Sequence, residues 1–324
     1  MRALVLTGFD GPSATALAEV ADPVTSDDSV MVAVQAAGVG AWDAQTSRGA
    51  FAGAGGLTTF PQVLGWDFAG TVTRVGTGVT DWQPGDPVLG FSPQPWAGAG
   101  AFAEAIAVPA SALARRPDGL AVEAAAALPV SILTADLAVR AAVTGAVLAA
   151  RAGGPAAAAP SVLILGAVGG VGRLATQLAV AAGAVVIASV AADQAAMATA
   201  LGATLVVDRS ESVVDQVLSR HGQVDAVIDL VGPAARAGIG AAIKDGGRFV
   251  STVPYGDTPD ERAIDSTSIQ VLPNGARLAE LAALAADGEL RIAVGQVIPF
   301  AEAARALADV EAGAGPGKVV LDLG

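Results

Sequence analysis

The sequence predicts an α/β protein in which a β-rich domain accompanies a doubly wound domain built on a parallel sheet. A buried apolar strand at 162–165 breaks into a glycine-rich turn and continues as a helical pattern. From residue 122 onward, apolar strands alternate with alanine-rich helices, whereas short strands separated by Gly and Pro turns occupy about the first third of the chain. Strand–helix alternation of this kind indicates a parallel sheet with helices on both faces. A length of 324 residues suits two domains.

The glycine-rich turn is the most informative motif. Glycines let the backbone turn sharply and approach a pyrophosphate, and the following helix N-terminus offers free N–H groups and a partial positive charge. In the G-x-G-x-x-G register, Ala167 takes the place of the first glycine. The flanking strand and helix favour a Rossmann dinucleotide-binding turn over a tight turn in another α/β fold. We therefore expect coenzyme contacts from Gly166, Ala167, Gly169, Gly170, Val171 and Gly172.

The remaining elements follow from apolar periodicity and turn residues. In the first third, strands are expected at 2–6, 30–36, 69–75, 84–90 and 102–108. In the alternating region, strands are expected at 162–166, 184–189, 204–207, 225–230 and 247–251. Helices are expected at 278–284 and 300–310, and a last strand at 318–321 is expected to pack back on the first domain.

Composition excludes several classes of protein. The net charge of −13 argues against nucleic acid as a main partner, because phosphate contacts need clustered Lys and Arg. No uninterrupted apolar run has the length of a membrane span, so no membrane partner is expected. The N-terminus lacks the pattern of a signal peptide, which predicts a cytoplasmic protein.

The sequence also lacks the residues of a zinc site. It contains no cysteine, and its one histidine is His221. Zinc coordination by several Cys or His ligands within one chain is therefore excluded. A site for Mg²⁺ or Ca²⁺ made of carboxylates alone stays open, but the chain has no D-x-D-x-D-type loop, and no metal is expected. His221 follows a helix-like segment, where a basic side chain is favoured by the helix dipole, and we interpret it as structural.

A series of short motifs runs along essentially the whole chain in a fixed order. They lie at 37–39 with Asp43, 48–49, 60–70, 75–76, 82–88, 126–129 with 133–134, 166–172, 201–203, 224–225 with Asp229, and 317–318. Together they resemble the medium-chain dehydrogenase/reductase superfamily, in its zinc-free quinone oxidoreductase-like branch. The resemblance implies a GroES-like domain at 1–121 and 295–324, a Rossmann domain at 122–294, and an active cleft between them.

The resemblance also bears on the chemistry. Zinc-dependent relatives carry a cysteine and a histidine at the positions of Gly40 and Trp66, so this chain resembles a zinc-free member. Without a Lewis acid to polarise an alcohol or ketone, reduction of a quinone or a conjugated C=C bond is favoured. Quinone reductases of the branch commonly carry Asn at position 40 and Tyr at position 45, where this chain has Gly40 and Gln45, so their substrate contacts do not transfer.

The second strand of the alternating region bears on the nucleotide. An NAD-selective fold ends that strand with Asp or Glu, which binds the ribose 2′-hydroxyl. Here the position falls on Ser189, which does not repel a 2′-phosphate. The negative charge of Asp193 would repel a 2′-phosphate. Arg209 is either the source of positive charge that attracts the phosphate or a solvated loop residue. We predict NADPH.

Other candidates have a structural and a functional interpretation. Asp43 is either a turn cap or a proton relay, and Thr134 is either an N-cap or a contact of the carboxamide or ribose. Tyr255, the single tyrosine, is either a loop residue or a proton donor. Asp43 and Tyr255 are thus the catalytic candidates, and the further coenzyme contacts expected are Thr134, Val231, Ser251, Thr252, Val253 and Lys318.

The function favoured by the sequence is NADPH-dependent, zinc-free reduction of a quinone or an α,β-unsaturated carbonyl. One alternative is an enoyl or ketone reductase of secondary metabolism. A second is a dinucleotide-binding sensor whose hydride transfer is weak or lost, and a more distant one is a nucleotide-independent catalyst, against which the intact glycine turn argues. Relatives often pair through an edge strand of the Rossmann sheet, so a homodimer is expected.

Overall fold

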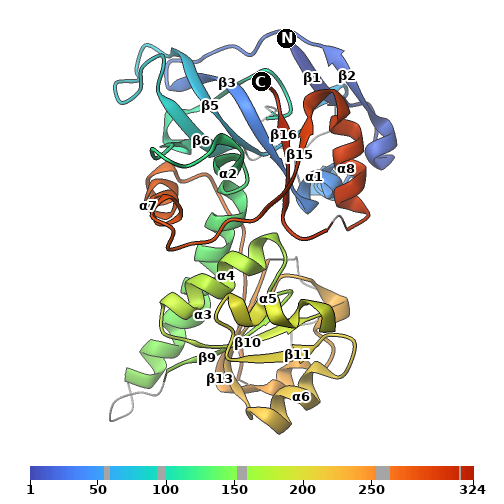
Figure 1. Ribbon diagram of the computed structural model, residues 1–324, viewed down its shortest axis with the longest axis vertical. Helices are drawn as coiled ribbons and strands as arrows, with labels where there is room; N and C mark the ends of the chain where they lie inside the picture. Colours follow the sequence, from blue (N-terminus) through green and yellow to red (C-terminus); the bar gives the residue numbers. More distant parts are fainter. Residues whose placement is uncertain (55–58, 93–99, 152–158, 253–262, 314) are drawn as a thin grey trace. The chain divides into compact units, whose positions relative to one another are not determined.

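The computed structural model describes residues 1–54, 59–92, 100–151, 159–252, 263–313 and 315–324. These residues form two compact units (Figure 1). The first unit comprises Met1–Val130 and Leu272–Gly324, and the second comprises Ser131–Val271. The chain therefore leaves the first unit once and returns to it, as expected for one domain inserted into another.

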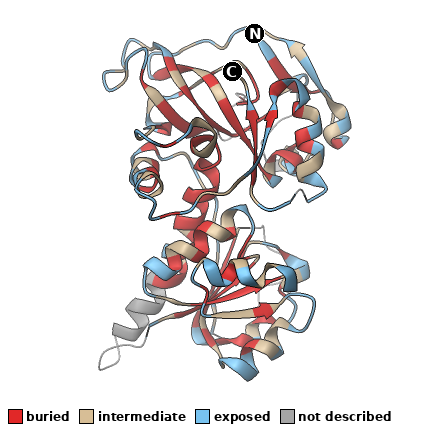
Figure 2. Cartoon of the chain, in the orientation of Figure 1, coloured by how far each residue is buried: buried red, intermediate tan, exposed pale blue. Residues whose placement is uncertain are grey.

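The first unit is built on two β-sheets. A seven-stranded sheet has the order β15-β16-β3-β5-β6-β8, with β7 pairing with β3, and a three-stranded sheet has the order β2-β1-β4. The strands are β1 (Arg2–Leu6), β2 (Thr15–Glu19), β3 (Ser29–Val39), β4 (Gln62–Val63), β5 (Asp67–Val75), β6 (Pro87–Phe91), β7 (Ala105–Pro109), β8 (Leu113–Arg115), β15 (Val294–Pro299) and β16 (Lys318–Asp322). The core of this unit consists of buried side chains such as Phe68 of β5 and Phe102, which precedes β7 (Figure 2).

The last strand, from the far end of the sequence, lies in the larger sheet between β15 and β3. β16 pairs antiparallel with β3, with Val320 opposite Gly38. A Cβ on Gly38 would overlap the carbonyl oxygen of Ala126 and would lie 3.1 Å from Cε of Lys318. Glycine is therefore required where β3, β16 and the helix α2 (Val122–Ala126) meet.

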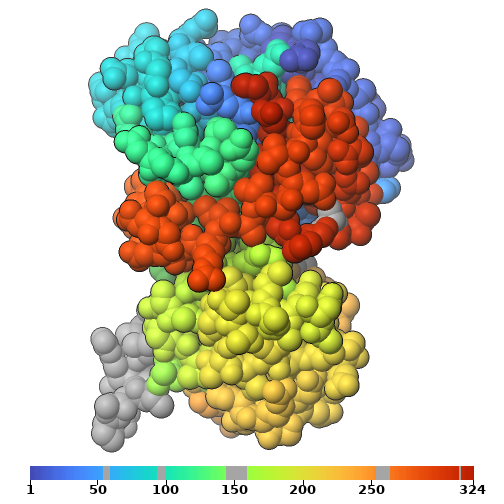
Figure 3. Space-filling model, in the orientation of Figure 1, coloured from blue at the N-terminus to red at the C-terminus, as the bar shows by residue number. Residues whose placement is uncertain are grey.

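Three more helices belong to the first unit: α1 (Ala41–Ser47), α7 (Gly275–Ala286) and α8 (Ala303–Glu311). α7 and α8 contribute to its outer surface (Figure 3). The domain division expected from the sequence assigned α7 to the Rossmann domain, with boundaries at 121/122 and 294/295. In the structure α7 packs against β8, because Gly275 allows the helix to approach the backbone of Leu113, and the divisions fall at 130/131 and 271/272.

The second unit is a doubly wound α/β domain, as the sequence predicts. Its six strands are all parallel and have the order β11-β10-β9-β12-β13-β14. They are β9 (Ser161–Leu165), β10 (Val185–Val190), β11 (Leu205–Asp208), β12 (Val224–Asp229), β13 (Ile243–Ser251) and β14 (Asp265–Ser268). The helices are α3 (Pro129–Arg151), whose first two residues belong to the first unit, α4 (Gly170–Ala181), α5 (Ala195–Ala200) and α6 (Val213–Arg220).

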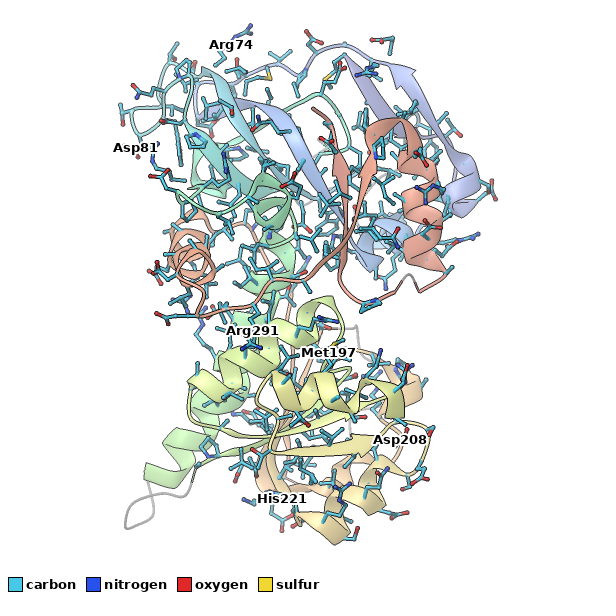
Figure 4. The ribbon with its side chains drawn as sticks, in the orientation of Figure 1. Arg74, Asp81, Met197, Asp208, His221 and Arg291 are labelled. Atoms are coloured by element: carbon cyan, nitrogen blue, oxygen red, sulfur yellow. The ribbon has the colours of Figure 1, made fainter. Side chains whose placement is uncertain are left out.

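His221 follows α6 and is exposed (Figure 4). Its backbone N–H donates to the carbonyl of Val217, which makes it the C-terminal cap of the helix. The interpretation of His221 as structural agrees with this position. Across the described part of the chain, none of the helices combines the length and the apolar character that crossing a bilayer requires.

Candidate functional site

The glycine turn joins β9 to α4 by a path that only glycine allows at two positions. Gly166 has φ of 79°, a left-handed conformation. A Cβ on Gly172 would overlap the carbonyl oxygen of Gly166 and would lie 2.8 Å from the carbonyl carbon of Ala167. These two glycines let the first turn of α4 approach the end of β9.

The N-terminus of α4 is open to a ligand. Gly169 is its N-cap and has no side chain to accept from the first-turn amides. The first amides of a helix lack intrahelical partners, and together with the helix dipole they form an anion-binding site. Carbons added at Gly169 and Gly170 would meet no described atom closer than 3.4 and 3.9 Å, respectively, so the space in front of the turn is open.

The strand order places this turn at the topological switch point of the sheet. β9 lies between β10, which follows it in sequence, and β12, which follows after a crossover to its other side. Ligands of doubly wound sheets bind at the carboxyl ends of the strands where the order reverses. Residues after β9, β10 and β12 are therefore the ones to consider for coenzyme binding.

The end of β10 differs from the prediction. The strand extends to Val190, and Ser189 lies inside it, buried and paired with Leu165 and Val207. The carbonyl of Ser189 accepts hydrogen bonds from the amides of the glycine turn, at 3.2 Å from Gly166 N and 3.4 Å from Ala167 N. The link to the turn is therefore made by the backbone of Ser189.

Arg209 lies beside the end of β10. It follows β11, its side chain is exposed, and its backbone N–H donates to the carbonyl of Val190 at 2.8 Å. The acidic Asp193 is also exposed, in the 3₁₀ turn Ala192–Gln194 that follows β10. Both side chains are therefore exposed close to the carboxyl end of β10.

The turn after β12 packs against the glycine turn. Val231 is 52% exposed, and a Cβ on Gly166 would lie 2.9 Å from its Cγ2 atom. Ser251 is fully buried at the end of β13, and the amide of Thr252 donates to the carbonyl of Asp229 at 3.1 Å. The turn after β12 and the end of β13 are thus tied together at the same edge of the sheet.

Three further residues complete the predicted coenzyme and proton-donor set. Thr134 is buried on α3, and Val253 and Tyr255 lie outside the described residues. The structure adds Ser131, which the sequence reasoning missed. Its buried hydroxyl has no hydrogen-bond partner within the described ranges, and it lies 3.9 Å from the place of a Cβ on Gly170. No local pattern identifies Ser131, because α3 and α4 are brought together only by the fold.

Asp43 caps α1 from inside the first unit. It is fully buried, and its Oδ2 accepts from the backbone N–H of Gly40 at 2.7 Å. Burial raises the pKa of Asp43 to about 8, although the hydrogen bond from Gly40 and the charge of Lys318 act in the opposite direction. This carboxyl group therefore retains its proton at neutral pH.

Lys318 is held by a second buried carboxylate. Its ammonium lies 3.1 Å from Oδ2 of Asp67 and 3.9 Å from the centre of the Trp42 ring. Oδ1 of Asp67 accepts from the backbone N–H of Val130 at 2.7 Å. Burial raises the pKa of Asp67 and the charge of Lys318 opposes this shift. Lys318, predicted as a coenzyme contact, is thus engaged by Asp67 and Trp42, a pairing that the sequence reasoning did not foresee.

The two positions that carry zinc ligands in zinc-dependent relatives hold no donor here. A Cβ on Gly40 would overlap the indole of Trp42, so that ring fills the space of a side chain at position 40. Trp66 stacks on Phe91 with 6.4 Å between ring centres. Within the described ranges no three His, Cys, Asp or Glu residues gather as metal ligands would. The residues present do not fit a Cys and His zinc site.

Two family models match the chain. The alcohol dehydrogenase GroES-like domain matches residues 26–118, in the first unit, and the zinc-binding dehydrogenase model matches residues 201–321. The chain belongs to the medium-chain dehydrogenase/reductase superfamily. The prediction from the sequence is therefore confirmed, including the quinone oxidoreductase-like branch.

Individual relatives of this dehydrogenase/reductase extend the match over the whole chain. A chloroplastic NADPH-dependent alkenal/one oxidoreductase of Arabidopsis thaliana is 29% identical over 99% of this chain and 79% of its own length. A 2-methylene-furan-3-one reductase of Solanum lycopersicum is 29% identical over 93% of this chain and 74% of its own. The quinone oxidoreductase structure from Coxiella burnetii has a TM-score of 0.88 at 27% identity, covering 100% of this chain and 99% of that one. The chain is an oxidoreductase of a fold that binds a nicotinamide dinucleotide.

Proposed function

We propose that this chain uses NADPH to reduce the conjugated double bond of an α,β-unsaturated carbonyl compound, or a quinone, without a metal ion. The observation that carries the proposal is the glycine turn at the switch point of a chain that aligns, over 99% of its length, with an alkenal/one oxidoreductase. The second relative is named a 2-methylene-furan-3-one reductase, and the compound in this name carries a methylene group next to a ketone.

The residues present fit a dinucleotide. Gly166 and Gly172 provide the close approach of backbone that a pyrophosphate needs, and the uncapped N-terminus of α4 provides the donors. When bound, NADPH supplies the hydride. The chain's own part is to hold the coenzyme through Gly166, Ala167, Gly169, Gly170, Val171 and Gly172, with Thr134, Val231, Ser251, Thr252 and Val253 as further proposed contacts.

The choice of NADPH over NADH rests on charge at the end of β10. This strand does not end in Asp or Glu. The backbone N–H of Arg209 donates a hydrogen bond to the carbonyl of the strand's last residue, Val190. A guanidinium at this edge attracts a 2′-phosphate. We propose that Arg209 provides this attraction and that it outweighs the exposed Asp193.

The reaction also needs a proton, because hydride added to one carbon of the conjugated bond leaves an enolate. Asp43 is the proposed proton source in the described residues, since its raised pKa of about 8 leaves it protonated at neutral pH. Tyr255 is the second proposed donor. Lys318 is held in place by Asp67 and Trp42, and we propose that its positive charge favours an anionic coenzyme or enolate oxygen.

A binding titration followed by a substrate panel tests the proposal. The full chain should bind NADPH more tightly than NADH, and absorbance of NADPH at its nicotinamide band should fall on addition of enones or quinones. Tight binding without turnover on either panel would favour the sensor alternative. That alternative is motivated by Gly40 and Gln45, which replace the Asn and Tyr common in quinone reductases. No affinity for either coenzyme would reject the proposed function.

The homodimer stays a prediction. The second unit's sheet ends at β11 on one side and at β14 on the other, each a strand of four residues. Sedimentation of the purified chain at several concentrations distinguishes a dimer from a monomer.

A further inference from the structure

The loop after β12 carries a charged side chain that the proposed function does not use. Arg236 follows the 3₁₀ turn Pro233–Ala235 and its side chain is only 6% exposed. In the part of the chain that the structure describes, its Nη1 and Nη2 atoms have no hydrogen-bond partner. A guanidinium is always charged and offers N–H donors in a rigid planar fork, so a buried one without acceptors is an incomplete arrangement.

The neighbouring carboxylate does not complete it. Oδ2 of Asp229 lies 3.7 Å from Nη1 of Arg236, which is beyond hydrogen-bond distance. Oδ1 of Asp229 accepts from the backbone N–H groups of Val231 at 3.0 Å and Gly232 at 2.9 Å. Oδ2 also accepts from the hydroxyl of Ser251 at 3.4 Å. Asp229 therefore shapes the turn and provides a charge near Arg236, but it does not fill the donor positions of the fork.

The location of Arg236 points to a ligand. Asp229 is the last residue of β12, next to β9 at the switch point, and Val231 lies against the glycine turn. The 52% exposure of Val231 shows that this turn reaches solvent. A loop at the carboxyl edge of these two strands is where a doubly wound sheet binds its ligands.

We propose that Arg236 is an oxyanion-binding residue at the carboxyl edge of β12, whose two terminal nitrogens bind two oxygens of one phosphate or carboxylate group. This inference rests on the proposed function, because it adds a ligand contact to the same edge of the sheet. The group belongs either to the coenzyme, as a phosphate, or to the substrate, as a carboxylate. Both offer the paired oxygens that a guanidinium fork matches.

The test compares Arg236→Met and Arg236→Lys with the wild type and with a control. Arg236→Lys keeps the charge and removes the fork. Arg220→Met is the control, because Arg220 is an exposed arginine of the same unit whose Nη1 donates to the carbonyl of Val206. NADPH affinity is measured by isothermal titration, and inorganic pyrophosphate is the probe in a thermal-shift titration of the full chain. An enone bearing a carboxylate is compared with its methyl ester in steady-state kinetics.

A coenzyme ligand predicts that Arg236→Met weakens NADPH and pyrophosphate binding by about tenfold or more, with Arg236→Lys intermediate and Arg220→Met unchanged. A substrate ligand predicts instead that KM for the carboxylate-bearing enone rises about tenfold relative to the ester, while NADPH affinity is kept. Either result supports the site. The melting temperatures of the variants are also measured without ligand. A variant that binds weakly but melts like the wild type has lost a ligand contact, whereas a lowered melting temperature indicates a folding defect, for which Arg236→Lys is the milder change.

The inference is overturned if both substitutions leave NADPH, pyrophosphate and the acid-to-ester ratio of KM within twofold of the wild type. Arg236 would then only compensate the charge of Asp229. Failure of the proposed function gives a different result, namely no NADPH binding by the wild type. In that case a pyrophosphate shift that Arg236→Met abolishes still supports the anion site, and a shift that survives the substitution rejects it.

Discussion

The two units build their candidate sites by opposite means. In the second unit the glycine turn consists of backbone, and its shape depends on the absence of side chains at Gly166 and Gly172. In the first unit the site consists of side chains, with Lys318 held by Asp67 from 251 residues away and by the ring of Trp42. The first arrangement is sensitive to atoms that are added, whereas the second is sensitive to charges that are removed.

The largest effect is expected when the buried pair of the first unit is broken. Asp67→Leu leaves the ammonium of Lys318 buried without its carboxylate, and we expect a loss of about 3–5 kcal/mol in the free energy of unfolding. Removing both charges, in Asp67→Leu with Lys318→Met, should restore most of this stability. Urea unfolding followed by tryptophan fluorescence measures it, because all four tryptophans lie within residues 42–96 of the first unit. An Asp67→Leu variant as stable as the wild type would show that the first unit does not depend on the charge of Asp67.

In the second unit, a methyl group added to the glycine turn should weaken coenzyme binding. Gly172→Ala brings a Cβ onto the carbonyl oxygen of Gly166, so α4 must shift away from β9. Overpacking of this kind costs about 1–3 kcal/mol, and we expect coenzyme affinity to fall about 10- to 100-fold. Gly53→Ala is the matched control, since a Cβ there meets no atom of the described residues within 4 Å. Unchanged NADPH binding in isothermal titration of Gly172→Ala would show that the turn does not hold the coenzyme.

The buried acid of the first unit predicts a pH dependence of stability. The pKa of Asp43 is raised from 3.8 to about 8 by folding. Between these values the folded state keeps a proton that the unfolded state has released, so the free energy of unfolding falls as pH rises through this window and levels off above about 8. The slope from one such group is at most about 1.4 kcal/mol per pH unit.

Asp43→Asn should remove this slope, measured by urea unfolding at a series of pH values. Asp86→Asn is the contrasting variant, because hydrogen bonds from Arg115 and the backbone of Gln83 lower the pKa of Asp86. Asp86 contributes stability above its unfolded pKa, and this stability is lost as the pH falls. Asp86→Asn should therefore lower the free energy of unfolding at neutral pH, and it should change the slope on the acid side only. A slope that persists unchanged in Asp43→Asn would mean that Asp43 ionises normally.

The smallest effect is expected at the exposed charge beside β10. Arg209→Gln should weaken NADPH binding about fivefold and leave NADH binding unchanged, because an exposed arginine contributes about 1 kcal/mol to holding a phosphate. Arg220→Gln, an exposed arginine on α6, is the control for net charge. Equal weakening of both coenzymes in competition titrations would assign Arg209 a role other than recognition of the 2′-phosphate.

Several parts of the fold were not predictable from local pattern. β14 (Asp265–Ser268) consists of polar residues, so no apolar pattern predicts it, and only its pairing with β13 defines it as a strand. Helix α7 has an ordinary helical spacing, and only its contact with β8 assigns it to the first unit. The end of β10 lies one residue beyond the prediction, which moved Ser189 into the interior of the sheet.

The sequence by itself determined the parallel sheet and the glycine turn, because both depend on contiguous residues: apolar strands, their spacing, and backbone conformations open only to glycine. It also excluded a Cys and His zinc site, because the donors are missing from the chain. Only the tertiary structure decided that Asp67 and Trp42 hold Lys318, that Asp43 is buried with its proton, and that Arg236 is buried beside Asp229. The energies of buried charges depend on neighbours far away in sequence, which no local pattern contains.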